Sequence, residues 1–365
     1  EGTSCSSVED CVEKCDASAT CAGYTSTCTD SSVADTAEAC GTQNGYSAAA
    51  VSTHATPDTS DTNTWSAYDC DSTDTSGKFT LSSNCQLDGE VILNGDLTIV
   101  GSSENMASLK TITAKTGKRH FKLNGATHKL HLWHVKLTGG DVSSETANPN
   151  RIGGSILIFQ SGGALNLYYS ELSGNKAKSG GAMATNGVDK NINVNIYNSI
   201  IKSNEATDWD GGGFTLAFSD VTIEDTTIED NEAGLNGGGL RIWECDINIK
   251  NTIIKNNDAG RDGGGLAILR DNTVIIIRES SLTGNDATDE GDEIYTEYDP
   301  TITVVNTVIP STSNNIVVKS GDTPTWNTCS ASPCTEAPHT GACSAVSSSD
   351  AKLGVVCSGP TLSHE

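Results

Sequence analysis

The sequence predicts an all-β protein built as a parallel β-helix, a solenoid of about eight coils with a disulfide-rich module at each end. Three observations predict this fold: short runs that alternate apolar and polar residues, an asparagine that recurs at a nearly constant interval, and glycine clusters that follow it. The chain divides into a Cys-rich module with a Ser/Thr-rich linker (1–80), the β-helix (81–320) and a Cys-rich tail (321–365).

The alternating runs indicate strands with one buried face, because successive side chains of a strand point to opposite sides. They recur over residues 194–201, 221–228, 247–254 and 302–309. One asparagine follows each complete repeat unit: Asn175, Asn204, Asn231, Asn257 and Asn285. Glycines follow each asparagine, at 180–181, 211–213, 237–239, 263–265 and 291.

A repeat of about 27 residues with two or three short strands and two sharp turns predicts one solenoid coil. Coils stack at about 4.8 Å, so the inward Ile, Val and Leu side chains would form apolar ladders. The asparagines would stack as an amide ladder at one corner. The glycines would supply positive φ or close backbone approach at the turns. A sandwich lacks such a regular corner residue, and the Leu-x-x-Leu-x-Leu pattern of leucine-rich repeats is absent.

The 13 cysteines fall into two even sets and one odd residue. Even sets at both ends predict flanking modules stapled by disulfides, which replace a large core. The eight cysteines of the N-terminal set could form four disulfides in 105 different ways, so no pairing follows from the sequence. The odd residue, Cys245, is either a buried free thiol, which we favour, or part of an intermolecular or cross-module bridge. The disulfide candidates are Cys5, Cys11, Cys15, Cys21, Cys28, Cys40, Cys70, Cys85, Cys329, Cys334, Cys343 and Cys357.

The N-terminal segment predicts a short helix over 7–15, because Ser7 caps it and Cys11 and Cys15 share one face. With the following Cys21-Ala22-Gly23-Tyr24, this short segment resembles the helix and strand of a PAN/apple-type module. Such modules bind carbohydrate or protein, so the resemblance implies an extracellular setting. The Ser-, Thr- and Asp-rich stretch 47–80 is typical of a linker and leaves O-glycosylation open, whereas the chain holds no Asn-x-Ser/Thr sequon.

An apolar residue stands three positions before each recurrent asparagine, as in Leu172-x-x-Asn175 and Ile201-x-x-Asn204. These pairs resemble the Phe-x-x-Asn motif of polymorphic outer-membrane-protein repeats, and Gly180-Gly181-Ala182-Met183 resembles their Gly-Gly-Ala-apolar motif. The stretch 97–140 resembles the opening coils of the pectate-lyase-like group. The likeness extends over positions 85–310 and implies a right-handed β-helix. The chain departs from the outer-membrane family by ending in a Cys-rich tail, so we expect no membrane insertion.

The pectate-lyase-like group includes polysaccharide lyases and hydrolases, and a polygalacturonase-like site would need acidic pairs on adjacent coils, a Gly-His-Gly and an Arg-x-Lys. Neither of the last two motifs is present. A lyase would need carboxylates for Ca²⁺ beside a basic residue, and no basic residue of the repeats stands in a recognisable catalytic spacing. An enzymatic assignment would therefore rest on fold analogy alone, and we expect no catalytic residues.

Two clusters invite a metal assignment. His120, His128, His131 and His134 lie close together in the sequence, but a spacing of three alternates faces on a strand, so we expect surface or turn histidines. The acidic turn at 286–293 offers oxygen ligands for a loosely held Ca²⁺, yet the EF-hand pattern is not met. We therefore expect no metal site and no cofactor.

The formal net charge of −25 disfavours nucleic acid as a partner. Basic and acidic residues are also segregated along the chain. Between 105 and 140 there is no acidic residue, and between 286 and 299 there is no basic one. The basic set is Lys110, Lys115, Lys118, Arg119, Lys122, Lys129 and Lys136. The acidic set is Asp286, Asp289, Glu290, Asp292, Glu293, Glu297 and Asp299.

Sequence order is spatial order along a solenoid, so one end would be basic and the other acidic. Opposite ends of opposite charge favour heterologous, head-to-tail contacts between copies of the chain. We therefore expect an extracellular, non-enzymatic structural protein that assembles into a fibre or surface appendage, such as a flagellar hair or sheath. The alternatives are a glycan-binding adhesin, two solvated patches on a monomer and, third, a polysaccharide-cleaving enzyme.

Overall fold

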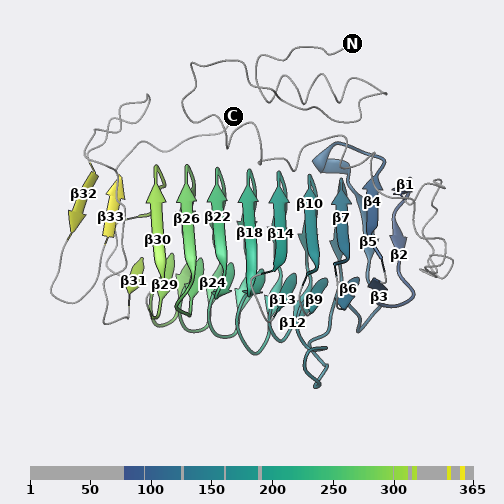
Figure 1. Cartoon of the computed structure of the whole chain (residues 1–365), viewed down its shortest axis with the longest axis horizontal. Coiled ribbons are helices and arrows are strands. Elements are labelled where there is room, and N and C mark those ends of the chain that lie inside the picture. Colours follow the sequence, from purple (N-terminus) through teal and green to yellow (C-terminus); the bar gives the residue numbers. More distant parts are fainter. Residues whose placement is uncertain are drawn as a thin grey trace, which may run out of the picture.

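Parallel strands stack side by side along the long axis of the molecule in the computed structural model of the chain (Figure 1). The structure describes residues 78–93, 95–124, 127–159, 162–187, 191–298, 300–310, 315–318, 343–346 and 354–357. Every pairing between strands of residues 78–318 is parallel, and each strand pairs with its counterpart one coil earlier and one coil later. The predicted all-β parallel solenoid of about eight coils is confirmed.

Three long sheets and one short sheet form the walls of the solenoid. Sheet A contains β1 (Lys78–Leu81), β4 (Leu97–Gly101), β7 (Lys129–Trp133), β10 (Ala164–Tyr168), β14 (Ile192–Tyr197), β18 (Ser219–Glu224), β22 (Asp246–Lys250), β26 (Val274–Arg278) and β30 (Thr301–Val305). Sheet B contains β2 (Cys85–Gln86), β5 (Lys110–Thr113), β8 (Val135–Thr138), β11 (Glu171–Ser173), β15 (Ile200–Lys202), β19 (Thr227–Glu229), β23 (Ile253–Lys255) and β27 (Ser281–Thr283).

The remaining two sheets complete each coil. Sheet C contains β3 (Val91–Leu93), β6 (Phe121–Asn124), β9 (Ile156–Phe159), β13 (Met183–Asn186), β17 (Phe214–Ala217), β21 (Leu240–Trp243), β25 (Leu266–Ile268), β29 (Ile294–Thr296) and β31 (Ile316–Val318). Sheet D contains β12 (Lys176–Ala177), β16 (Glu205–Ala206), β20 (Glu232–Ala233), β24 (Asp258–Ala259) and β28 (Asp286–Ala287). A coil runs through sheets A, B, D where present, and C, and we number coils by the order of their sheet A strands.

The long alternating runs are not single strands, which corrects the expectation from the sequence. Residues 194–201 divide between β14 and β15 at a corner residue, Asn198, whose φ is 47°. The same corner recurs at Asp225 and Asn251, with φ of 51° and 46°. Asn and Asp tolerate this left-handed region better than most residues do. The alternation continues through the corner because the inward side chains on both sides enter one core.

The core fills the solenoid from end to end with stacked aliphatic side chains. One continuous cluster of buried residues extends from Leu81 to Ile316. A single inward column illustrates it, with one residue from each successive sheet A strand in register: Leu132, Leu167, Ile196, Ile223, Ile249 and Ile277. All six are fully buried, so the predicted apolar ladders are confirmed.

Helical structure is nearly absent from the described residues, where one 3-10 turn, η2 (Met106–Ser108), is the helical element. In this part of the chain, no helix has the length and hydropathy that crossing a membrane would require. A hairpin apart from the solenoid pairs β32 (Cys343–Val346) with β33 (Gly354–Cys357) antiparallel, and its register sets Cys343 opposite Cys357.

Candidate functional site

The five recurrent asparagines form a continuous amide ladder at the corner after sheet B. In four successive steps, the Nδ2 of one asparagine donates to the Oδ1 of the next at 2.8–3.0 Å. The same Oδ1 also accepts the backbone N–H of the preceding asparagine. The second Nδ2 hydrogen reaches a backbone carbonyl of the coil before, as from Asn231 to Ile201. Each buried amide within the ladder is therefore fully satisfied.

The ladder ends on a carboxyl group instead of a sixth amide. Asn285 Nδ2 donates to Glu293 Oε2, and the backbone N–H groups of Gly284 and Asn285 also donate to this carboxyl. Glu293 is 2% exposed, and burial raises its pKa to about 7 against the opposing effect of these donors. Register places it where coils 5 to 7 have Gly213, Gly239 and Gly265.

A second ladder, of hydroxyl groups, stabilises the corner between sheets A and B. Its members are Ser170, Ser199, Thr226, Thr252, Ser280 and Thr307, and each donates to the carbonyl two residues earlier. Four of the hydroxyl oxygens also accept a backbone N–H from the member before, as from Ser170 to Ser199 at 3.2 Å. The sequence carries a signal for this ladder that we missed, a Ser or Thr five residues before every ladder asparagine.

The basic and acidic sets lie near opposite ends of the solenoid, although one coil lies beyond each. The basic set occupies coils 2 and 3, and the described acidic residues belong to coil 8. Lys115, Lys118 and Lys129 are exposed, as are Asp286 and Asp289. Lys110, Lys122, Lys136, Glu290, Asp292 and Glu297 are half-buried, and Asp299 lies outside the described residues.

Two members must be removed from these surface sets, which corrects the expectation from the sequence. Arg119 is 2% exposed, forms an ion pair with Glu90 and donates to the carbonyls of Asn150 and Gly153. Burial lowers the pKa of this guanidinium, and Glu90 opposes the shift. Glu293 is buried at the end of the asparagine ladder. Neither side chain is available to another chain.

The histidines differ from the expectation that all would be surface or turn residues. His134 lies at a positive-φ turn after β7, but His120 and His131 are buried. Nε2 of His120 contacts the carbonyls of Ile112 and Thr138, at 3.0 and 3.1 Å, and Nδ1 accepts the hydroxyl of Ser155. Burial lowers the pKa of His120 to about 4, so it is a neutral structural residue. Within the described ranges, no three His, Cys, Asp or Glu side chains are grouped to hold a metal ion.

The cysteines of the described residues separate into bonded and free. Cys85 is disulfide-bonded. Cys245 is fully buried and forms no disulfide, which confirms the interpretation we favoured over a bridge to another module or chain. The predicted helix over 7–15 and the candidates Cys5, Cys11, Cys15, Cys21, Cys28, Cys40, Cys70, Cys329 and Cys334 lie outside the described residues.

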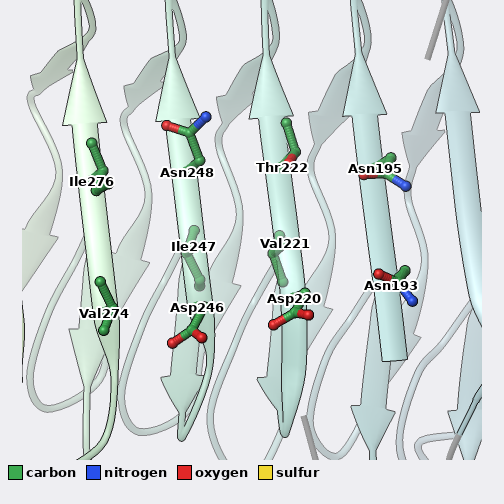
Figure 2. Close-up of a pocket in the computed structure, with 10 residues that line it drawn as sticks. All are labelled: Asn193, Asn195, Asp220, Val221, Thr222, Asp246, Ile247, Asn248, Val274 and Ile276. Atoms are coloured by element: carbon green, nitrogen blue, oxygen red, sulfur yellow. The ribbon is translucent and has the colours of Figure 1, made fainter. Parts of the chain in front are cut away.

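A shallow groove lies on the outer face of sheet A. It has a volume of about 270 Å³ and crosses β14, β18, β22 and β26 (Figure 2). Outward side chains form two rows in register, and each row has one residue from each strand. The first row is Asn193, Asp220, Asp246 and Val274, and the second is Asn195, Thr222, Asn248 and Ile276.

The groove combines hydrogen-bonding groups with an aliphatic end. Asp220 and Asp246 lie opposite each other on adjacent strands, so two carboxylates of neighbouring coils stand side by side in the groove. Asn248 Oδ1 is buried and has no hydrogen-bond partner within the described residues. Val274 at the other end is 40% exposed. Amide, hydroxyl and carboxylate groups beside aliphatic side chains can bind both the hydroxyls and the C–H faces of a sugar.

Comparison with known proteins was made against families, curated sequences and solved structures. No family model, curated protein or solved structure matches this chain.

Proposed function

We propose that this chain is an extracellular, non-enzymatic structural protein that assembles with itself head to tail into a fibre or surface appendage. The observation that carries the proposal is the separation of exposed cations in coils 2 and 3 from exposed carboxylates in coil 8. Coils 3 and 8 are five steps apart, or roughly 24 Å at about 4.8 Å per coil. That separation exceeds the Debye length of about 8 Å at physiological ionic strength, so the two ends do not neutralise each other.

The coil geometry supports an assembly of rods. In the described residues, β1 and β30 are the outermost strands of sheet A, and the core residues at the two ends, Phe79 and Val304, are only partly buried. The outermost strand of a sheet can pair with a strand of another chain where nothing else covers its edge. A disulfide at Cys85 is consistent with an oxidising, extracellular compartment. We keep the resemblance to polymorphic outer-membrane-protein and right-handed β-helix repeats within this proposal, on the strength of the Asn and Gly positions.

A charge-swap experiment tests the assembly. We expect light scattering by the wild-type chain to increase at low salt. Lys115→Glu with Lys129→Glu should reduce that increase, because the fully exposed side chains of the basic set change from three lysines to one lysine and two glutamates. Adding Asp286→Lys and Asp289→Lys to the same chain exchanges the signs of the fully exposed side chains at the two ends and returns the net charge to that of the wild type, so it should restore the scattering if these side chains make the contact. All four side chains are exposed, so folding should be unaffected. If the quadruple variant stays as dispersed as the double variant, charge pairing is not the basis of assembly.

The sheet A groove favours one alternative, a glycan-binding surface protein. Its paired rows of amides, hydroxyl and carboxylates repeat at the coil spacing and would follow an extended chain of sugars. Titration calorimetry with neutral oligosaccharides tests this function. Asn195→Ala with Thr222→Ala should remove the binding heat if the groove is the site, and unchanged heat would exclude it. Because these substitutions lie far from both charged ends, they should leave self-assembly unchanged.

A further inference from the structure

Arginines and aromatic rings alternate along one side of the solenoid, beside sheet C. The guanidinium carbon of Arg151 lies 4.1 Å from the ring centroid of Trp209. Arg241 and Arg270 lie 4.3 and 4.2 Å from the ring of Trp243. Arg270 also approaches the ring of Tyr298, at 5.4 Å.

Strand geometry explains how these residues come together. On β21, Leu240 and Ile242 point into the core, so the alternating Arg241 and Trp243 point outward. Arg270 follows β25 in coil 7, and Tyr298 follows β29 in coil 8. The row therefore crosses consecutive coils parallel to the solenoid axis.

Asp210 joins the two halves of the row. It follows Trp209 directly in the sequence, and its carboxylate lies 3.6 Å from Nε of Arg241. The row of contacts thus continues from Arg151, in the loop before β9, to Tyr298. Burial lowers the pKa of Arg241, while Asp210 opposes the shift and the nearby Arg270 adds to it.

The arginines of the row have unused hydrogen-bonding capacity. Nε of Arg151, Arg241 and Arg270 is buried in each case without a hydrogen-bond partner among the described residues, so an external ligand would bind to the terminal amino groups of these guanidiniums instead. Arg270 also forms no ion pair within these residues, whereas Lys176, Lys250 and Lys255 of neighbouring coils each pair with a carboxylate one coil away. A guanidinium has five N–H donors that suit carboxylate, sulfate and phosphate groups. Stacking on two rings holds Arg270 in place and leaves the rest of its donors for a ligand.

We propose that this row, Arg151, Trp209, Arg241, Trp243, Arg270 and Tyr298, binds a linear acidic polysaccharide. Its carboxylate or sulfate groups pair with the guanidiniums that the tryptophan rings hold in place, and a sugar ring packs on the face of Tyr298. Tyr298 is 41% exposed and supplies an open ring for this packing. None of the arginines and tryptophans of the row belongs to the two charged sets proposed for assembly, although Tyr298 directly follows Glu297 of the acidic set in coil 8.

Binding to defined polymers tests the site. Dextran sulfate and alginate supply sulfate and carboxylate groups respectively, and unmodified dextran is the neutral control. The wild-type chain should bind one or both acidic polymers and should not bind dextran. Arg270→Gln should weaken that binding roughly tenfold or more, because one charge-assisted hydrogen-bonding group is lost. Comparing the two acidic polymers identifies which anionic group is preferred.

The matched control is Arg278→Gln, which removes the same charge from an exposed residue on sheet A that has no aromatic partner in the described residues. It should bind within about twofold of the wild type, since ordinary surface charges contribute little. Equal losses from the two variants, or no binding of either acidic polymer by the wild type, would overturn the proposal. Arg270→Gln should still self-assemble at low salt, so failure of this site and failure of the assembly proposal give different results.

Discussion

The residue type that fits a position in the solenoid depends on the side chains that stand in register with it on the neighbouring coils. Cys245 stands in register between Ser219 and Thr273, so a thiol fills a position that hydroxyl residues occupy in the adjacent coils. Its Sγ contacts the carbonyl of Trp243 at 3.3 Å, as the hydroxyl of Ser219 contacts that of Ala217 at 3.0 Å. The thiol is therefore explained by packing and a local hydrogen bond.

Cys245→Ser should change the free energy of unfolding by less than about 1 kcal/mol, because serine already occupies the equivalent position, Ser219, in the adjacent coil. Urea denaturation of the two proteins measures the difference. Native wild-type protein should also resist iodoacetamide at Cys245 until it is unfolded, since the side chain has no exposed surface. Rapid labelling of the folded protein would contradict the buried position.

Glu293 makes stability depend on pH in a specific direction. Its pKa is raised from 4.5 to about 7 in the folded chain, so the unfolded chain ionises first as the pH rises. Stability is therefore lost between about pH 4.5 and 7, by about 3 kcal/mol in all, and no more is lost above that range. Glu293→Gln keeps an acceptor for Asn285 without a charge to bury. The variant should gain stability relative to the wild type across this interval, measured by urea denaturation at several pH values. A difference between the two proteins that does not change with pH would contradict the burial of an ionisable carboxyl here.

At the scale of elements, the glycine clusters and the asparagine ladder pack against each other at the same corner of successive coils. A Cβ on Gly239 would lie 2.6 Å from the carbonyl oxygen of Gly265 and 3.3 Å from Nδ2 of Asn257. The backbone of the next coil thus requires a glycine at this position, and the ladder asparagine beside it leaves little room for a side chain. Glu293 can replace glycine at this register position in coil 8, where the ladder of five asparagines has ended.

Gly239→Ala should destabilise the solenoid by about 2 kcal/mol or more, because backbone atoms cannot move away from the added methyl group. The matched control is Gly89→Ala, where an added Cβ meets nothing within 4 Å. That change should be neutral or stabilise by up to about 1 kcal/mol through the unfolded state. Thermal unfolding of both variants checks the contrast, and similar losses at the two positions would refute the steric argument.

Asn231→Ala should interrupt the ladder at its centre. It removes the acceptor for two N–H groups of Asn204 and both side-chain donors of Asn231. Leaving buried polar groups unpaired costs about 1–3 kcal/mol each, so we expect a loss of at least about 3 kcal/mol in urea denaturation. Asn195→Ala, on the solvent side of sheet A with one amide hydrogen bond to Asn166, should lose about 1 kcal/mol or less. Equal losses would show that the ladder has no special contribution.

The sequence predicted the repeating length of a coil better than the positions at which the strands of each coil begin and end. Asn231 and Gly239 were identifiable because a coil of nearly constant length repeats them at one corner. The corner at Asn198 was not, since inward residues alternate through it as they would along one strand. The burial of Glu293 and the contact of Arg270 with Trp243 depend on which residues adjacent coils bring together, and small differences in length between coils hide this. The sequence around Glu293 also does not indicate that the asparagine ladder ends beside this residue and leaves room for its side chain.

At the scale of the whole molecule, the solenoid turns the order of charges in the sequence into a direction in space. The net charge of −25 conceals a basic set of seven side chains in coils 2 and 3, so the remainder of the chain sums to −32 (−25 minus 7). After the buried Arg119 and Glu293 are removed, exposed lysines and aspartates still mark opposite ends. The groove on sheet A and the arginine–aromatic row lie along the sides of the rod, where they would stay accessible in a head-to-tail fibre.

Sedimentation velocity of the wild-type chain at micromolar concentration tests the central claim, head-to-tail assembly through opposite charges, most directly. At about 0.01 M salt the Debye length is about 30 Å, and at about 0.15 M it is about 8 Å, so attraction between the ends should weaken steeply between these conditions. We expect species larger than the monomer at the lower salt concentration and predominantly monomer at the higher one. A chain that sediments as a monomer at both salt concentrations would contradict the account.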